Sequence, residues 1–200
     1  YAANFKGNIV KHRLGTMASN GNLLWLKGRA NDLLRLSEDR LATCNQNGEI
    51  IFLSSSSMAS KGKIQAHNDE VIAIALNSDS SLLCSATISG EIKVWSLENR
   101  QLEETYHGRT GRINDIAFND DGRYVAAGFH DGNIRVFDLL TFNSFELNGS
   151  AHIAKINDRI NVQCRSLNWD GDQLKISFLK TKKSNELLWM YDYIKAFELS

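Results

Sequence analysis

An all-β fold assembled from a repeated unit is predicted by three features: similar segments at a fixed interval, short runs of β-branched residues, and turn residues between the runs. The similar segments read NGEIIFLS from Asn47, SGEIKVWS from Ser89 and DGNIRVFD from Asp131, and a weaker copy begins at Lys6. The glycines of the three strong copies lie 42 residues apart both times. A period of about 40–45 residues built from short strands is typical of a β-propeller.

The clearest unit spans about residues 66–107. Its four predicted strands are 71–76, 82–87, 92–95 and 102–106. Asn, Ser and Asp residues make the turn between the first two strands. A tight hairpin at Gly90 joins the second and third strands, and glycine there supplies the positive φ that such turns require. Four short antiparallel strands with turn signals between them form one propeller blade.

The neighbouring units repeat this order of strands and turns. The next unit predicts strands at 113–118, 124–128, 134–137 and 143–147. The preceding unit predicts strands at 33–36, 40–44, 50–53 and 63–64, and the last at 162–169, 173–178, 187–191 and 193–199. We therefore predict a single domain over residues 1–200, with blades at approximately 1–27 (partial), 28–65, 66–107, 108–149 and 150–200.

Composition limits the classes of function. Lys plus Arg and Asp plus Glu number 23 each, so no net charge argues for direct contact with nucleic acid. The three cysteines, Cys44, Cys84 and Cys164, fall in predicted strands, and we expect buried thiols of an intracellular protein, without disulfides. No apolar run approaches the ~18 residues that a membrane span requires, and no secretory signal is visible. We expect a cytoplasmic or nuclear location.

The repeated pattern resembles the WD40-repeat family over nearly the whole chain, most strongly in the two middle units. In that family a His before the first strand, a Ser or Thr ending the second, an Asp in the next turn and a Trp in the third strand form a hydrogen-bonded set. The resemblance assigns His67, Thr87 and Trp95 to this structural network, with Ser89 where Asp is usual.

In the following unit Asp131 matches the family's Asp, but three other positions depart from the pattern. Arg109 stands at the His position, Phe129 replaces the hydroxyl and Phe137 replaces Trp. We therefore expect neither unit to hold a complete set, and apolar packing to contribute correspondingly more.

Members of the family mostly have seven blades, whereas four to five are present in this chain. A propeller needs a closed ring to remove exposed sheet edges. Because Tyr1 begins inside a blade, we expect the chain to be part of a larger, seven-bladed ring. The alternative is that another chain completes the ring.

No residue pattern points to chemistry. The five histidines lie in different units without metal-ligand spacing, and 108–111 lacks the Lys and the helix of a phosphate-binding loop. His67 and Asp69 near a Ser could be taken for a catalytic pair, but the resemblance gives His67 a structural role. We expect no catalytic residues, no metal and no cofactor.

The resemblance implies a non-catalytic scaffold that binds other proteins of a multisubunit complex. The loops before each first strand and the short hairpins would form the docking rim. Its candidate residues are Arg29, Asn31, Asp69, Glu70, Arg109, Arg112 and His130. Mixed charges suit specific recognition better than binding of a polyanion. The alternative is a sensor or regulatory propeller of a larger signalling protein such as an NTPase, which a nucleotide-binding domain before Tyr1 would indicate.

Overall fold

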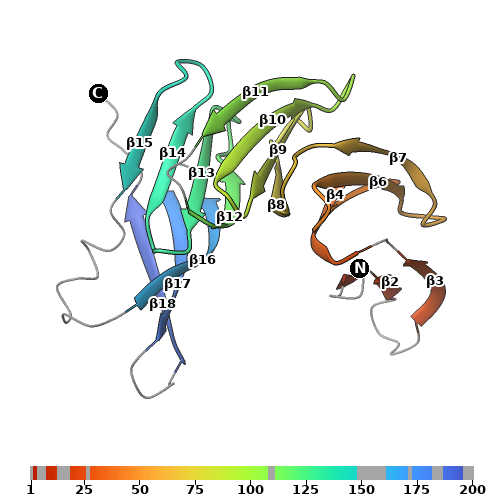
Figure 1. The fold of residues 1–200 in the computed structure, drawn as a ribbon, viewed down its shortest axis with the longest axis horizontal. Coiled ribbons are helices and arrows are strands. Elements are labelled where there is room, and N and C mark those ends of the chain that lie inside the picture. The colour runs from red at the N-terminus through yellow and green to blue at the C-terminus, as the bar shows by residue number, and fades with distance from the viewer. Residues whose placement is uncertain are drawn as a thin grey trace.

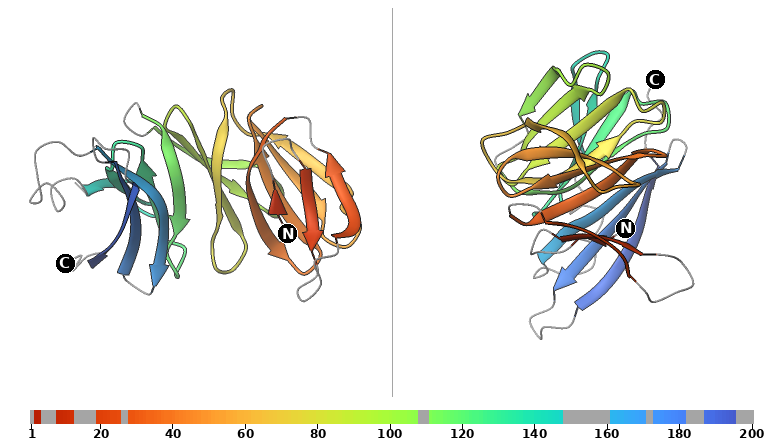
Figure 2. Two further views of the ribbon diagram at one scale, coloured as in Figure 1. Left: turned by 90° about the horizontal axis from the view of Figure 1, so that it is seen from below. Right: turned by 90° about the vertical axis from the view of Figure 1, so that its right-hand side faces the viewer.

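The computed structural model of this chain is all-β, as predicted. It describes residues 2–3, 8–12, 19–25, 28–107, 111–147, 161–170, 173–181 and 187–195. Within these ranges every regular element is a β-strand, and each sheet is an antiparallel meander in chain order. The sheets follow one another around an open arc (Figure 1), with the first and last sheets at opposite ends when the molecule is seen from below (Figure 2).

The described strands form three sheets of four strands and two of three. The first sheet contains β1 (Ala2–Ala3), β2 (Asn8–His12) and β3 (Ser19–Trp25), and the second β4 (Ala30–Ser37), β5 (Arg40–Asn45), β6 (Glu49–Ser54) and β7 (Ser60–Gln65). The third contains β8 (Val71–Leu76), β9 (Leu82–Thr87), β10 (Glu91–Ser96) and β11 (Leu102–His107). The fourth contains β12 (Ile113–Phe118), β13 (Tyr124–Phe129), β14 (Ile134–Asp138) and β15 (Ser144–Leu147), and the fifth β16 (Asn161–Asp170), β17 (Gln173–Thr181) and β18 (Leu187–Lys195).

Turn residues at the 42-residue interval fix the strand order within the sheets. Gly48, Gly90 and Gly132 have φ of +78°, +95° and +86°, as the hairpin prediction requires. A Cβ at Gly48 would lie 2.1 Å from the carbonyl oxygen of His67, so this turn also needs the space that glycine leaves. The turn between the first two strands is closed by a repeated asparagine: Asn77 Oδ1 accepts from the Leu82 amide and Asn119 Oδ1 from the Tyr124 amide.

The last sheet differs from the prediction at one place. Residues 187–191 and 193–199 were predicted as two strands, but β18 is continuous from Leu187 to Lys195 and pairs with β17 along its whole length. Asp192 pairs with Ile176 inside this ladder. The segment lacks the Gly or Asn of the other turns, so nothing in its chemistry forces the chain to reverse there.

The core lies between successive sheets, because apolar side chains project from both faces of each four-stranded sheet. Trp95 and Leu83 pack with Phe52 and Ile50 between the second and third sheets. On the opposite face of the third sheet, Val94 packs with residues of the fourth sheet such as Ile116. The first strand of each unit contacts the first strand of the next, from β4 to β8, β12 and β16. These strands therefore line the inner edge of the arc and place the residues before them at one rim.

Candidate binding rim at the inner edge of the sheets

A chain of hydrogen-bonded side chains joins the segment before β8 to strands β9 and β10. His67 Nδ1 lies 2.6 Å from Glu91 Oε2, and His67 Nε2 lies 2.7 Å from Ser85 Oγ. Trp95 Nε1 donates to Ser85 Oγ at 2.9 Å. An indole N–H can only donate and a carboxylate can only accept, so Trp95 donates to Ser85 and His67 Nδ1 donates to Glu91, while the direction of the Ser85–His67 bond is set by the charge of the imidazole.

A neutral His67 with its proton on Nδ1 accepts at Nε2 from the Ser85 hydroxyl. Burial lowers the pKa of His67, although the hydrogen bond to Glu91 opposes the shift. Burial also acts against the charge on Glu91, but the hydrogen bond from His67 and the charge of Lys93 outweigh it and lower the Glu91 pKa. The network is therefore a neutral imidazole held by an ionised carboxylate, a structural arrangement that ties the rim loop to two strands.

The hydroxyl of this network is Ser85, not the expected Thr87. Thr87 instead closes the hairpin: its Oγ1 accepts from the Glu91 amide at 3.0 Å and lies 3.0 Å from Ser89 Oγ. Side chains alternate along a strand, so residues 85 and 87 project from the same face of β9. The sequence pattern selected the wrong one of these two hydroxyls. It also missed Glu91, which takes the place of the turn aspartate.

The third sheet thus holds a complete set of four hydrogen-bonded side chains, contrary to expectation. The fourth sheet departs from the family's hydrogen-bonded set, as expected. Asp131 accepts from the backbone and side-chain nitrogens of Asn133, at 3.0 and 2.8 Å, and so closes its own exposed turn. Phe137 packs 5.2 Å from the Tyr106 ring, measured between centroids. Apolar packing replaces the polar network between these two sheets.

Three of the candidate rim residues form one cluster at the start of the second and third sheets. Arg29 Nε donates to Asn31 Oδ1 at 2.8 Å, and the Arg29 guanidinium forms an ion pair with Glu70. Asn31 Nδ2 donates to Glu70 Oε1 at 2.9 Å and to the Val71 carbonyl oxygen at 2.6 Å. Side chains at the start of the second sheet thereby bond to the start of the third sheet.

Asp32 strengthens the same contact between sheets. Its Oδ1 accepts from the Leu33 amide at 2.7 Å, and its Oδ2 accepts from the Ile74 amide of β8 at 3.0 Å. Asn31 and Asp32 thus bond a carbonyl and an amide of one neighbouring strand. We call the Arg-X-Asn-Asp segment 29–32 the first clasp.

A second clasp of the same sequence pattern occupies residues 112–115, before and within β12. Arg112 Nε donates to Asn114 Oδ1 at 3.1 Å, and Asn114 Nδ2 donates to the Cys164 carbonyl oxygen of β16 at 2.7 Å. Asp115 Oδ2 accepts from the Leu167 amide at 2.7 Å. Each of these bonds has a counterpart in the first clasp, whereas the contacts of the first clasp with Glu70 have none among the described residues of the fourth and fifth sheets.

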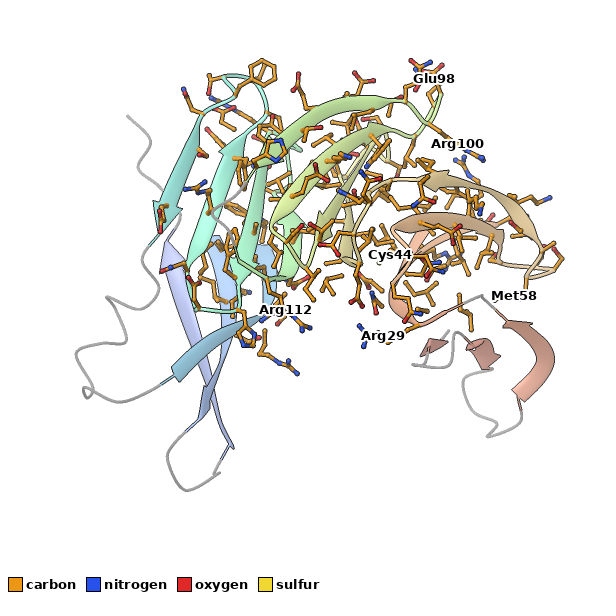
Figure 3. All side chains as sticks on the ribbon, viewed as in Figure 1. Arg29, Cys44, Met58, Glu98, Arg100 and Arg112 are labelled. Atoms are coloured by element: carbon orange, nitrogen blue, oxygen red, sulfur yellow. The ribbon has the colours of Figure 1, made fainter. Side chains whose placement is uncertain are left out.

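The two clasps differ in the charge that they expose. Arg29 is paired with Glu70, whereas Arg112 is exposed and forms no ion pair within the described part of the chain. Both arginines lie on the concave side of the arc (Figure 3). Burial raises the pKa of Asp115 to about 6 and also raises that of Asp32. The clasp aspartates are therefore costly to ionise in place, and their backbone donors partly offset that cost.

The remaining rim candidates lie near the clasps. Asp69 Oδ1 accepts from the Glu70 amide at 2.8 Å, which orders the loop before β8. His130 is exposed, and its amide donates to the Arg112 carbonyl oxygen at 2.8 Å, which places it beside the second clasp. Arg109 lies outside the described residues. Sequence reasoning missed Asn114 and both clasp aspartates, although the recurrence of Arg-X-Asn-Asp at 29 and 112 is a signal that could have found them.

The described ranges bear on two further features: a cluster of metal ligands and a helix able to span a membrane. No group of three or more His, Cys, Asp or Glu there is arranged to hold a metal ion. The described part of the chain also contains no helix with the length and apolar character of a membrane span. Cys44, Cys84 and Cys164 are buried thiols in β5, β9 and β16, where burial raises their pKa values.

Comparison with known proteins agrees with this geometry. Residues 58–96 and 100–138 match the family model described as WD domain, G-beta repeat. The chain is similar to the WD repeat-containing protein SL1-17 of Schistosoma mansoni, with 32% identity over 40% of this chain and 26% of the relative. It is similar to Autophagy-related protein 18 of Dictyostelium discoideum, with 29% identity over 66% of this chain and 36% of the relative. A guanine nucleotide-binding protein subunit beta of Oryza sativa subsp. japonica is 29% identical over 40% of this chain and 22% of that protein. The matches thus span about a quarter to a third of these relatives.

Proposed function

We propose that the chain is a scaffold of the WD40-repeat type, non-catalytic and binding other proteins of a multisubunit complex; the two segments that match the WD-repeat model support this. The five sheets would be consecutive blades of one propeller domain. The docking surface would be the rim formed by the clasps and the loops beside them. We propose an intracellular setting, cytoplasmic or nuclear, and no direct contact with nucleic acid.

The observation that carries this proposal is the second clasp. Its arginine is exposed on the concave side of the arc, while Asn114 holds the guanidinium from behind. A charged group on a fixed support loses little conformational freedom when a partner binds, so more of the interaction energy remains as affinity. The relatives named above include proteins of quite different names, which fits a shared binding surface better than shared chemistry.

The geometry restricts which rim residue can test the proposal. Glu70→Lys would place a lysine against Arg29 and remove an acceptor of Asn31, so it would disturb the contact between two sheets. Arg112→Glu instead reverses an exposed charge whose only side-chain bond among the described residues goes to Asn114 in the same segment. The single variant Arg112→Glu is therefore the cleaner probe.

The matched control is Arg40→Glu. Arg40 is exposed at the start of β5, at the opposite end of the strands from the rim, and its Nε makes one long hydrogen bond of 3.4 Å to Ser37. Each tagged variant is purified from cells, and its bound proteins are quantified by mass spectrometry. We expect Arg112→Glu to lose bound proteins that Arg40→Glu retains, because a like charge in an interface is costly. Identical sets of bound proteins for both variants would show that the rim is not the docking surface.

A further inference from the structure

The turn between β14 and β15 displays apolar side chains to solvent. Leu140 is 71% exposed and Phe142 is 60% exposed, and both lie in the turn at residues 139–143. Among the described residues only one further large apolar side chain, Leu102, is exposed. The turn lies at the end of the outermost strands of the sheet, away from the clasps at the inner edge.

Hydrogen bonds hold this turn in one conformation. Asp138 Oδ1 accepts from the Leu140 amide at 2.9 Å and from the Thr141 amide at 3.3 Å. The Phe142 amide donates to the Asp138 carbonyl oxygen at 2.9 Å. Arg123 fixes the Asp138 carboxylate through two bonds, at 2.7 and 3.3 Å, and lowers its pKa. The exposed side chains are therefore presented by a rigid support and not by a loose loop.

The backbone at Phe142 is left-handed, with φ of +58°, a conformation that is costly for an aromatic residue. The residues one and two periods earlier, Arg100 and Met58, have φ of +60° and +59°. Both of these side chains contact neighbouring structure. Met58 is 3% exposed and packs with Leu53 and other apolar residues. Arg100 lies 4.5 Å over the Phe52 ring of the preceding sheet and donates to the Lys61 carbonyl oxygen.

Gly62 of the second sheet makes room for the Arg100 side chain, and the third sheet has no glycine at the equivalent position. A Cβ at Gly62 would lie 2.6 Å from Arg100 Nη1. Gly62 pairs with Phe52 in β6–β7, and the equivalent pair in β10–β11 is Glu104 with Val94. Glu104 thus carries a side chain where Gly62 has none. The surface that would receive Phe142 is occupied by glutamate, which accounts for the exposure of the aromatic ring.

The turn itself is neutral, because Arg123 pairs with Asp138, and the strands beside it add carboxylates, of which Glu146 pairs with Arg135 of β14. β11 and β15, as the structure describes them, contain no Lys or Arg. Their carboxylates belong to Glu103, Glu104 and Glu146. All three are exposed. An anionic lipid surface would be repelled by these carboxylates, whereas Lys and Arg side chains would be attracted.

We propose that residues 139–143 and the adjacent glutamates of β11 form a second docking site, which binds a protein segment carrying a large apolar residue flanked by lysine or arginine. Leu140 and Phe142 supply the apolar contact, and Glu103 and Glu104 pair with the flanking cations. Aromatic residues on rigid supports are common centres of binding energy in interfaces. This site is independent of the rim, since neither clasp contributes to it.

The test uses two synthetic peptides of about fifteen residues, each with a central Leu-Phe pair, flanked by four lysines in one and by four glutamates in the other. Binding to the chain is measured by fluorescence anisotropy. We expect the lysine peptide to bind at least tenfold more tightly than the glutamate peptide, and more weakly as salt is raised. We expect Phe142→Asn to weaken binding of the lysine peptide roughly tenfold or more, as loss of a central aromatic residue does.

Asn tolerates the left-handed conformation, so the Phe142→Asn variant keeps the turn. Arg100→Asn, at the equivalent position one period earlier, is the matched control and should leave peptide binding unchanged. Glu103→Lys with Glu104→Lys should reverse the preference between the peptides. Equal affinity for both peptides, no binding, or full binding by Phe142→Asn would overturn the proposal. Phe142-dependent binding to phosphatidylserine vesicles without a preference for the lysine peptide would overturn it in favour of a membrane site.

Discussion

Deleting the Ser85 hydroxyl tests the polar network of the third sheet. Ser85 is fully buried and bonds both the His67 ring and the Trp95 indole, which are themselves 2% and 6% exposed. Ser85→Ala leaves His67 Nε2 and Trp95 Nε1 without a partner, while His67 Nδ1 keeps its bond to Glu91. An unsatisfied buried polar group costs about 1–3 kcal/mol, so the variant should lose about 2–5 kcal/mol of unfolding free energy.

The matched control is Thr87→Val, which removes the other hydroxyl and keeps its shape. Thr87 Oγ1 bonds the exposed Ser89 and the Glu91 amide, so one donor loses its acceptor and the cost should be about 1 kcal/mol. Urea unfolding followed by tryptophan fluorescence and circular dichroism measures both values. In a Trp95→Phe background, Ser85→Ala should cost less, because one of its two partners is already gone. A larger loss for Thr87→Val than for Ser85→Ala would refute the assignment of the network.

Three further perturbations test the clasps and the outer turns. The Asp115 pKa is raised to about 6 from 3.8, so the folded state binds more protons than the unfolded state between these values, and stability falls as pH rises through that window. Asp115→Asn removes this penalty. The unfolding free energy of the variant minus that of the unsubstituted chain should therefore rise by roughly 3 kcal/mol from pH 3.5 to pH 7. A difference that does not change with pH would contradict the burial argument. Gly62→Ala places a Cβ against Arg100 and strains the backbone at φ +114°, so it should lower the unfolding free energy by about 1–3 kcal/mol. Adding Arg100→Ala should recover only part of this loss. Full recovery in the double variant would rule out backbone strain. Phe142→Asn should raise the unfolding free energy by up to about 1 kcal/mol, since Asn tolerates the left-handed backbone; a clear loss in urea unfolding would show that the ring is buried.

Local signals in the sequence account for most of the strand predictions. The strands 71–76, 82–87 and 113–118 were predicted with the bounds that the structure has. Apolar runs bounded by Gly, Asn and Asp define both the strands and the turns, and the 42-residue interval transfers each assignment to the next unit. These signals act within one blade, where neighbours in space are also neighbours in sequence.

Features that depend on contacts between blades were not predicted. The bond from Asn31 to the Val71 carbonyl oxygen joins residues 40 positions apart, and nothing local to either residue indicates it. One contact within a sheet was also not predicted: the choice between Ser85 and Thr87 depends on how far the Trp95 ring reaches, which a period of two along a strand cannot decide. Similarly, the exposure of Phe142 follows from Glu104 in the neighbouring blade. The predicted rim residues that the structure describes lie beside the first strands, while their function as a rim stays a proposal.

Hydrogen–deuterium exchange of the chain, free and bound to a captured protein, tests the docking rim most directly. Amide protection is measured on peptides that cover the rim loops 28–31, 68–71, 111–114 and 130–133, and on peptides that cover the opposite turns 37–40, 78–81 and 120–123. The account predicts slower exchange on binding in the rim loops, strongest around Arg112, and unchanged exchange in the opposite turns. Protection confined to the opposite turns, with the rim unchanged, would contradict it.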